Sequence, residues 1–350
     1  MKNENSSKRI EYIDAMRGFT MLLVVMTHVC GFGFGVILSD VTSYSKFFAE
    51  FRMPLFFFVS GFVLYKTTTV WSLGYTLSFL KKKIPVQLIT PFVFMMANIW
   101  VRHISFGDAV FDYKKSGYWF TFTLMEYFFF YIVTNQVLDL TKAKGLLRDV
   151  VLLLSGIFMY CATIPTLMEK WPLDESMKGL LGVPVWGNYL FMVIGTLVRK
   201  HFEKFEKTLE NTPLVMLSII IYFCFNVWSE FFRPISSTGF NLLCSLSGLV
   251  LVFAFFRKNK ETFRKECWVG SIMQYVGRRT LDIYLIHYFF VISNLDSVFP
   301  NFGELNSPFI EFVVSLILSI TIIAACLVVS HVFRLSPTLA HLMFGARVEK

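Results

Sequence analysis

Charged residues are scarce in this sequence. Asp, Glu, Lys and Arg make up 16% of its 350 residues, whereas soluble domains carry about a quarter. Hydrophobic residues account for 55% of the chain, and 41 residues are phenylalanine. This composition excludes a soluble protein with a large core and predicts a chain that lies mostly within a membrane.

Cysteines are also few, and they show no paired spacing. A disulfide framework or a zinc site needs ligands that cluster in polar loops, whereas most of these cysteines lie in apolar runs. We therefore expect no metal site. We interpret the six cysteines as small apolar filler residues: Cys30, Cys161, Cys224, Cys244, Cys267 and Cys326.

Long apolar runs take up most of the chain. A membrane-spanning helix needs about 20 mostly apolar residues. The predicted fold class is therefore all-α, a polytopic integral membrane bundle of about ten transmembrane helices with both termini cytoplasmic. The predicted spans are 19–38, 47–65, 84–104, 119–138, 149–166, 181–198, 213–229, 239–256, 280–296 and 309–333.

The basic residues indicate the orientation, because Lys and Arg collect in the cytoplasmic connections of membrane proteins. The connections 66–83, 139–148, 199–212 and 257–279 are predicted loops on the side of the N-terminus, together with the tail from Arg334. If the connections alternate between two sides, 25 of the 33 basic residues lie on this side and 8 on the other. Topology then explains the net charge of +9, and no nucleic-acid partner is needed. We expect a multi-pass protein of a bacterial cytoplasmic (inner) membrane.

Three segments follow from these spans: a cytoplasmic N-terminal segment 1–18, a transmembrane domain 19–333 and a cytoplasmic tail 334–350. We do not expect the N-terminus to be a cleavable signal peptide. Its polar stretch contains the acidic residues Glu4 and Glu11, and the apolar run that follows is long enough to span.

One apolar run, RGFTMLLVVMTHV, begins with Arg17 and contains His28. On a helix the eleven residue steps from Arg17 to His28 turn about 1100°, close to three full turns, so both side chains share a face about 16 Å apart along the axis. Asp14 lies one turn before Arg17 and can pair with it. Arg17 alone is ordinary for a cytoplasmic helix end. His28 is either a buried hydrogen-bonding strut or, as a neutral imidazole, a general base.

Three later stretches also place ionisable groups deep in predicted spans. FRMPLFFFVSGF contains Arg52 and ends in the small pair Ser60-Gly61, which permits close helix packing. GYWFTFTLMEYFFFYIV contains Glu126, and GRRTLDIYLIHYFF contains His287. Each group alone is compatible with snorkelling or a buried hydrogen bond. Because several occur at comparable depth, we predict a shared polar cavity.

This chemistry leaves two classes of protein open. An intramembrane enzyme would use the buried Glu and His as acid and base, and a proton-coupled transporter would use them as relays. The sequence has no Ser-His-Asp order, zinc signature or phosphate loop. It also lacks the corresponding halves typical of many transporters.

Together the motifs resemble the acyltransferase-3 family of multi-span membrane O-acyltransferases. YIDAMRGFTMLLVVMTHV is similar to that family's opening signature, and MPLFFFVSGF resembles its second-span motif. YWFTFTLMEYFFFY is similar to its third stretch, with Trp119 and Glu126 in matching places. LDIYLIHYF resembles its late Tyr-x-x-His span, with Tyr284 and His287. The matches occur in the family's order from end to end of the chain.

The resemblance implies transfer of an acyl group, commonly acetyl, from acetyl-CoA to a hydroxyl of a sugar or envelope glycan. In this O-acetylation, His28 would be the base or a transient acyl carrier. Glu126 would orient an imidazole or bind the sugar, and Arg52 would polarise the carbonyl or anchor the acceptor. The donor would bind on the cytoplasmic side at Asp14, Arg17, Arg278, Arg279, Tyr284 and His287.

The alternative function is a transporter or exporter of a polar envelope metabolite. A third is an inactive relative that acts as a partner in a polysaccharide assembly complex, although Arg17 and His28 are both intact. The identity of the acceptor, the length of the acyl group, the side of transfer and the oligomeric state stay open at this point.

Overall fold

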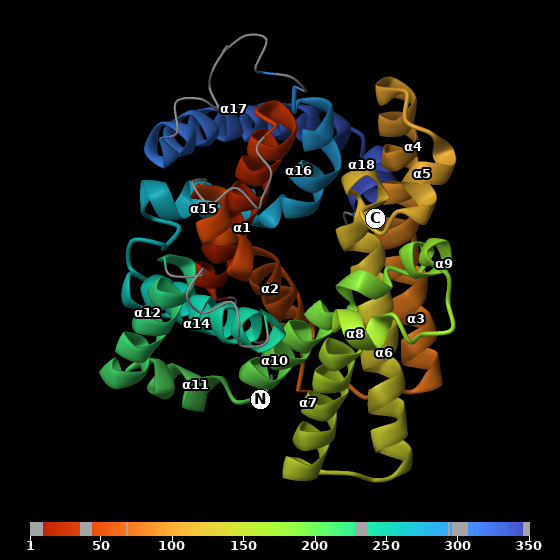
Figure 1. Cartoon of the computed structure of the whole chain (residues 1–350), viewed down its shortest axis with the longest axis vertical. Coiled ribbons are helices and arrows are strands. Elements are labelled where there is room, and N and C mark those ends of the chain that lie inside the picture. The colour runs from red at the N-terminus through yellow and green to blue at the C-terminus, as the bar shows by residue number, and fades with distance from the viewer. Residues whose placement is uncertain are drawn as a thin grey trace. The chain divides into compact units, whose positions relative to one another are not determined.

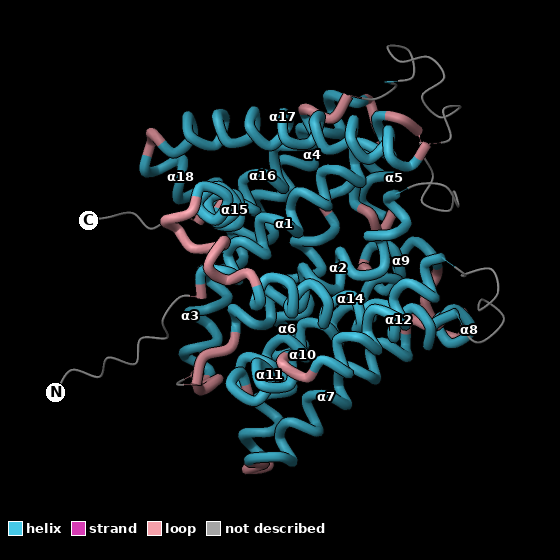
Figure 2. The backbone as a smooth tube through the Cα atoms, turned by 90° about the vertical axis from the view of Figure 1, so that its left-hand side faces the viewer, coloured by secondary structure: helices cyan, strands magenta, loops and turns pink. Residues whose placement is uncertain are grey.

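The structure is a computed structural model that describes residues 10–35, 44–67, 69–227, 237–292, 295 and 307–345. In this part of the chain every regular element is a helix, as Figures 1 and 2 show. The predicted all-α class is therefore confirmed. Residues 36–38, 228–229, 293–294 and 296 of the predicted spans lie outside the described residues.

The chain forms two compact units, and the division between them falls inside several helices. Unit 1 comprises Met1–Arg52, Lys204–Tyr284 and Val291–Ala324, and unit 2 comprises Met53–Glu203, Leu285–Phe290 and Ala325–Lys350.

Unit 1 is built from the first and the later helices of the chain. Its elements are α1 (Glu11–His28), the π-helix η1 (Val29–Gly33), the start of α2 (Tyr44–Leu64), most of α11 (Phe202–Leu209), α12 (Thr212–Val227), α14 (Ser237–Lys258), α15 (Trp268–Arg278), the start of α16 (Thr280–Ile286) and most of α17 (Pro308–Arg334).

Unit 2 contains the middle of the chain. Its elements are the rest of α2, α3 (Leu73–Ile84), the π-helix η2 (Pro85–Ile89), α4 (Thr90–Arg102), α5 (Phe106–Phe111), η3 (Lys115–Gly117), α6 (Trp119–Leu140), α7 (Gly145–Ala162), α8 (Pro165–Met168), α9 (Glu175–Leu180), η4 (Val183–Asn188), α10 (Tyr189–Lys200), η5 (His287–Phe289) and α18 (Pro337–Phe344).

Among the described residues, six helical segments are long and apolar enough to cross a membrane. They match six predicted spans: Glu11–Gly33, Tyr44–Leu64, Leu73–Arg102, Gly145–Ala162, Gly239–Lys258 and Pro308–Arg334. The predicted count of ten and the placement of the termini are not confirmed. The spans predicted at 119–138 and 213–229 coincide with α6 and α12, which are not among the six.

Two predicted spans and one predicted loop need correction. The span at 181–198 is not one helix. The twelve-residue α10 begins only at Tyr189, because Gly182 takes a left-handed φ of 67° and a 3-10 turn with Pro184 follows it. The segment 66–83 is not a loop throughout, since helix α3 begins at Leu73.

The span predicted at 280–296 is not one continuous helix. α16 has seven residues and gives way to the 3-10 turn η5. In unit 2 two carbonyls of this region bind side chains from elsewhere in the chain. Tyr118 donates to the Leu285 carbonyl at 3.0 Å, and Arg102 donates to the Tyr288 carbonyl at 2.7 Å. These bonds satisfy backbone groups that a helix would otherwise pair internally.

Small residues set the helix packing inside both units. In unit 1, α1 packs against α15, and a Cβ at Gly18 would lie 2.2 Å from the Met273 carbonyl oxygen. In unit 2, a Cβ at Gly61 would lie 1.9 Å from the Met192 carbonyl oxygen in α10. The close approach predicted for Ser60-Gly61 is thus present, and it needs glycine.

Candidate active site

His28 lies where the first helix changes its geometry. It is the last residue of α1, and the π-helix η1 begins at the next residue. Its ring stacks on that of Phe32, with centroids 5.6 Å apart. Single π-helical turns inside helices occur frequently at functional sites. The local backbone therefore marks His28 independently of its sequence motif.

Arg52 binds the residue before His28. In unit 1 its Nη1 donates to the Thr27 hydroxyl across α1 and α2. Thr27 is buried and also donates to the Leu23 carbonyl at 2.9 Å. The guanidinium is thereby held beside the helical turn that carries His28, so the structure brings these two predicted catalytic residues to one region.

Cys30 corrects the interpretation of the cysteines as apolar fillers. It is buried in η1, with its Sγ 3.1 Å from the Tyr44 hydroxyl and 3.0 Å from Glu311 Oε1. Ser315 Oγ lies 3.3 Å away. Tyr44 comes from α2, and Glu311 and Ser315 come from α17, more than 280 residues away in sequence. The apolar surroundings of Cys30 in the chain were therefore misleading.

Three predicted donor-binding residues, Asp14, Arg17 and Arg279, lie around the start of α1 and the end of α15. Arg17 Nη1 is 3.8 Å from Asp14 Oδ1, and Arg17 Nη2 donates to Thr280 Oγ1 at 3.1 Å. Arg279 Nη1 is 3.5 Å from Asp282 Oδ2. Each guanidinium thus has a carboxylate partner and is held on a fixed backbone.

The other predicted donor-binding residues differ in accessibility. Arg278 is exposed, whereas Tyr284 is buried in unit 1. His287 belongs to unit 2, where it is fully buried and its ring centroid lies 4.0 Å from that of Tyr288. Burial of Tyr284 and His287 favours a packing role for both, so their predicted donor contacts stay predictions.

Glu126 lines a cavity of about 600 Å³ in unit 2, which we call the Glu126 pocket. Its volume falls in the range of small-molecule sites, about 300–1,000 Å³. His287 is not among its lining residues. Most of the wall is apolar and comes from η2, α4, α6 and the segment after α9, including Phe92, Met95, Phe122, Phe129, Phe130 and Leu181.

At the polar end of the Glu126 pocket, hydrogen bonds and a close backbone approach surround the carboxylate. Trp186 Nε1 donates to Glu126 Oε2 at 2.8 Å and also contacts the Leu181 carbonyl at 3.1 Å. A Cβ at Gly182 would lie 3.2 Å from Glu126 Oε2, so glycine lets the backbone approach the carboxylate. The carboxylate is therefore fixed in position within a mainly apolar wall.

Lys115 also lines this pocket and is only 7% exposed. Its Nζ donates to three carbonyls, those of Val110 at 2.5 Å, Gly179 at 2.9 Å and Leu180 at 3.1 Å. Burial lowers the pKa of Lys115, and the Glu126 carboxylate opposes this effect. Lys115 thus links the short helices α5 and α9 at the edge of the pocket.

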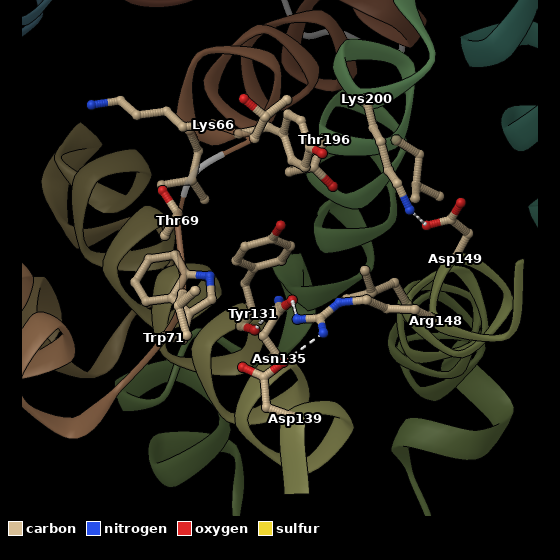
Figure 3. Close-up of a pocket in the computed structure, with 16 residues that line it drawn as sticks. Lys66, Thr69, Trp71, Tyr131, Asn135, Asp139, Arg148, Asp149, Thr196 and Lys200 are labelled. Carbon is tan, nitrogen blue, oxygen red and sulfur yellow. Dashed lines mark hydrogen bonds and ion pairs between the residues drawn. The ribbon is translucent and has the colours of Figure 1, made fainter. Parts of the chain in front are cut away.

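A second cavity of unit 2, about 250 Å³, has a polar lining (Figure 3). We call it the polar cavity. Tyr131, Asn135 and Asp139 recur every four residues and line it from one face of α6. Arg148 Nη1 lies 2.5 Å from Asp139 Oδ1, and Arg148 Nη2 donates to Asn135 Oδ1 at 2.7 Å.

The opposite wall of the polar cavity carries a second ion pair. Lys200 pairs with Asp149 (Figure 3), and its Nζ lies 2.5 Å from Asp149 Oδ1. Thr196 and the indole of Trp71 also line the cavity. Three of the connections that meet here were predicted to be cytoplasmic, namely 66–83, 139–148 and 199–212. The cavity offers hydrogen-bond donors, acceptors and cations together.

Sequence reasoning missed Lys115, Trp186 and the whole polar cavity. Trp186 donates a hydrogen bond to Glu126, which is 60 residues away in sequence, and no local pattern predicts this pairing. Arg148 and Lys200 entered the sequence argument only as orientation signals. The four-residue spacing of Tyr131, Asn135 and Asp139 was the one local sign of a polar face on α6.

The family of the chain follows from a comparison of its sequence with family models. The model of the acyltransferase-3 family, described as an acyltransferase domain, matches residues 10–328. The chain therefore belongs to this family, and with its apolar helices it is a multi-pass membrane acyltransferase. No curated protein and no solved structure matches the chain.

Proposed function

We propose that this chain transfers an acetyl group from acetyl-CoA to a hydroxyl of a sugar or envelope glycan, with His28 as general base. The observation that carries the proposal is the contact between Arg52 and Thr27 at the α1–η1 junction, in a chain of the acyltransferase-3 family. It places a fixed cation beside the turn that presents the histidine.

The reaction follows from the chemistry of these groups. The imidazole of His28 takes the proton of the acceptor hydroxyl as its oxygen attacks the thioester carbonyl. The carbon–sulfur bond breaks, an ester forms, and the coenzyme A thiolate leaves and takes the proton from the imidazolium. Arg52 stabilises the negative charge that develops on the carbonyl oxygen. If His28 instead carries the acyl group, an acyl-imidazole forms first.

The donor has two candidate sites for its phosphates. One is the cluster of Arg17 and Arg279 in unit 1, where guanidinium groups suit phosphate oxygens. The other is the polar cavity of unit 2, with Arg148 and Lys200. In both, carboxylates hold the cations in place before a ligand arrives. A comparison of donors with and without the nucleotide separates the two sites.

The proposal is tested with radiolabelled acetyl-CoA in membranes that contain the chain. We expect wild-type membranes to incorporate label into a glycan fraction, and His28→Ala to reduce incorporation at least about 100-fold. His331→Ala, which removes an exposed histidine of α17, is the matched control and should act like wild type. Wild-type activity in His28→Ala would remove His28 from the mechanism. A folded wild-type protein that consumes neither acetyl-CoA nor succinyl-CoA would favour the transporter.

A further inference from the structure

The chemistry of the Glu126 pocket points to the kind of acceptor. Its wall is almost entirely apolar, and four of its lining side chains, Phe92, Phe129, Leu180 and Leu181, are exposed. Phe129 is 57% exposed, although it sits in the middle of α6. A contiguous apolar rim of this kind is unfavourable in water and favourable in a bilayer. The pocket therefore opens toward hydrocarbon.

The polar groups of the pocket select between head groups. Glu126 is a carboxylate, which accepts hydrogen bonds and repels phosphate. Lys115 donates to three backbone carbonyls. A hydroxyl-bearing head can donate to Glu126, whereas a thioester with its nucleotide phosphates brings negative charge toward it. The acceptor, rather than the donor, matches this lining.

We infer that the Glu126 pocket binds the hydrocarbon tail of a membrane-resident acceptor and presents a hydroxyl of its head group to Glu126. The identification of this ligand as the acceptor rests on the proposed function. Binding itself requires only the pocket. The acceptor is then an amphiphile, such as a sugar on a lipid carrier, that reaches the pocket from within the bilayer.

The experiment uses the full chain in lipid nanodiscs and a dodecyl glucoside that carries a diazirine at the end of its alkyl chain. After illumination, labelled peptides are mapped by mass spectrometry. We expect label around Phe92, Phe129 and Leu181, enriched over the exposed face of α7 at Leu154 and Phe158. Glu126→Gln should lower this labelling about tenfold, because the amide oxygen that remains is a weaker hydrogen-bond acceptor than the carboxylate.

Two tryptophan variants supply the matched control. Leu181→Trp adds bulk to a pocket residue that is 38% exposed and should remove most of the labelling. Leu167→Trp makes the same change in α8 at a residue that is 43% exposed and does not line the pocket, and it should label like wild type. If Leu181→Trp fails to fold, Met125→Trp fills the same pocket from α6.

Several results would overturn the inference. Equal labelling of the pocket and of the α7 face would show only partition into lipid. Pocket labelling by a diazirine-bearing dodecanoyl-CoA that exceeds labelling by the glucoside would assign the pocket to the acyl donor. Pocket labelling without any acetyl transfer would support the pocket and contradict the proposed function, so the two failures are distinguishable.

Discussion

The two halves of helix α6 line cavities of opposite chemistry. Between Phe122 and Phe130 the helix contributes aromatic side chains and a single carboxylate to the Glu126 pocket. Between Tyr131 and Asp139 it contributes a hydroxyl, an amide and a second carboxylate to the polar cavity. Glu126 and Asn135 are nine residues apart, about 14 Å along the helix axis.

This difference shows how one helix can serve two kinds of ligand. The polar half meets basic connections that the charge pattern predicts to be cytoplasmic, where the proposed water-soluble donor would arrive. The apolar half meets aromatic and aliphatic side chains and suits a ligand that resides in the bilayer. An acyltransferase that joins a soluble donor to a membrane-bound acceptor needs both environments.

Lys115→Met should have the largest effect, and of the two cavities along α6 it should disrupt only the Glu126 pocket. The change removes the Lys115 donor from three carbonyls. Gly179 keeps a hydrogen bond from the Gly182 N–H, whereas the Val110 and Leu180 carbonyls lose a partner, and each unsatisfied group costs about 1–3 kcal/mol. We expect a loss of stability of about 3 kcal/mol and a loss of labelling in the Glu126 pocket. Thermal unfolding in nanodiscs measures the loss of stability, and diazirine labelling measures the loss of binding in the pocket. Lys114→Met, at the exposed neighbouring position, is the control, and equal losses in both variants would contradict the role of Lys115.

Arg148→Gln tests the polar half and has an intermediate effect. If the cavity binds the donor phosphates, the KM for acetyl-CoA should rise about tenfold, since one charge-assisted hydrogen bond is lost. The KM for acetyl-pantetheine, which lacks the nucleotide, should not change. The same pair of donors is measured with Arg17→Gln. The variant that affects only acetyl-CoA identifies the phosphate site, and equal effects on both donors would exclude a nucleotide contact at that residue.

Gly182→Ala should have the smallest effect, and it tests how precisely the Glu126 carboxylate must be positioned. Gly182 has a φ of 67°, and Gly145 has a φ of 57° with open space around its Cβ position. Both alanine variants should lose about 1–2 kcal/mol of stability, the cost of a left-handed backbone. Only Gly182→Ala places a methyl group 3.2 Å from Glu126 Oε2. It alone should reduce acetyl transfer, and equal activities would show that the carboxylate tolerates displacement.

The sequence predicted those helices whose apolar runs are long and uninterrupted. Pro308–Arg334 and Gly239–Lys258 were predicted within a few residues. The prediction failed at 181–198 and 280–296, where Pro184 follows a left-handed glycine and where side chains bind the backbone carbonyls of Leu285 and Tyr288. Such bonds depend on residues more than 150 positions away and leave no local pattern.

Candidate site residues could be named from the sequence, but their surroundings could not be predicted. Arg52 was expected deep in the second span, and its contact with Thr27 depends on how α2 packs against α1. Glu126 was expected to be buried, yet Trp186 and Lys115 hold and enclose it from other parts of the chain. Cys30 was interpreted as apolar because hydrogen-bond partners such as Glu311 are distant in sequence.

The most direct test of acyl transfer uses the purified chain in lipid vesicles with radiolabelled acetyl-CoA and dodecyl glucoside. Release of the coenzyme A thiol and formation of an alkali-labile labelled ester are measured in the same sample. We expect one coenzyme A thiol to be released for each ester formed, and both signals to be lost in His28→Ala. Folded wild-type protein that releases no thiol and forms no ester would contradict acyl transfer by this chain.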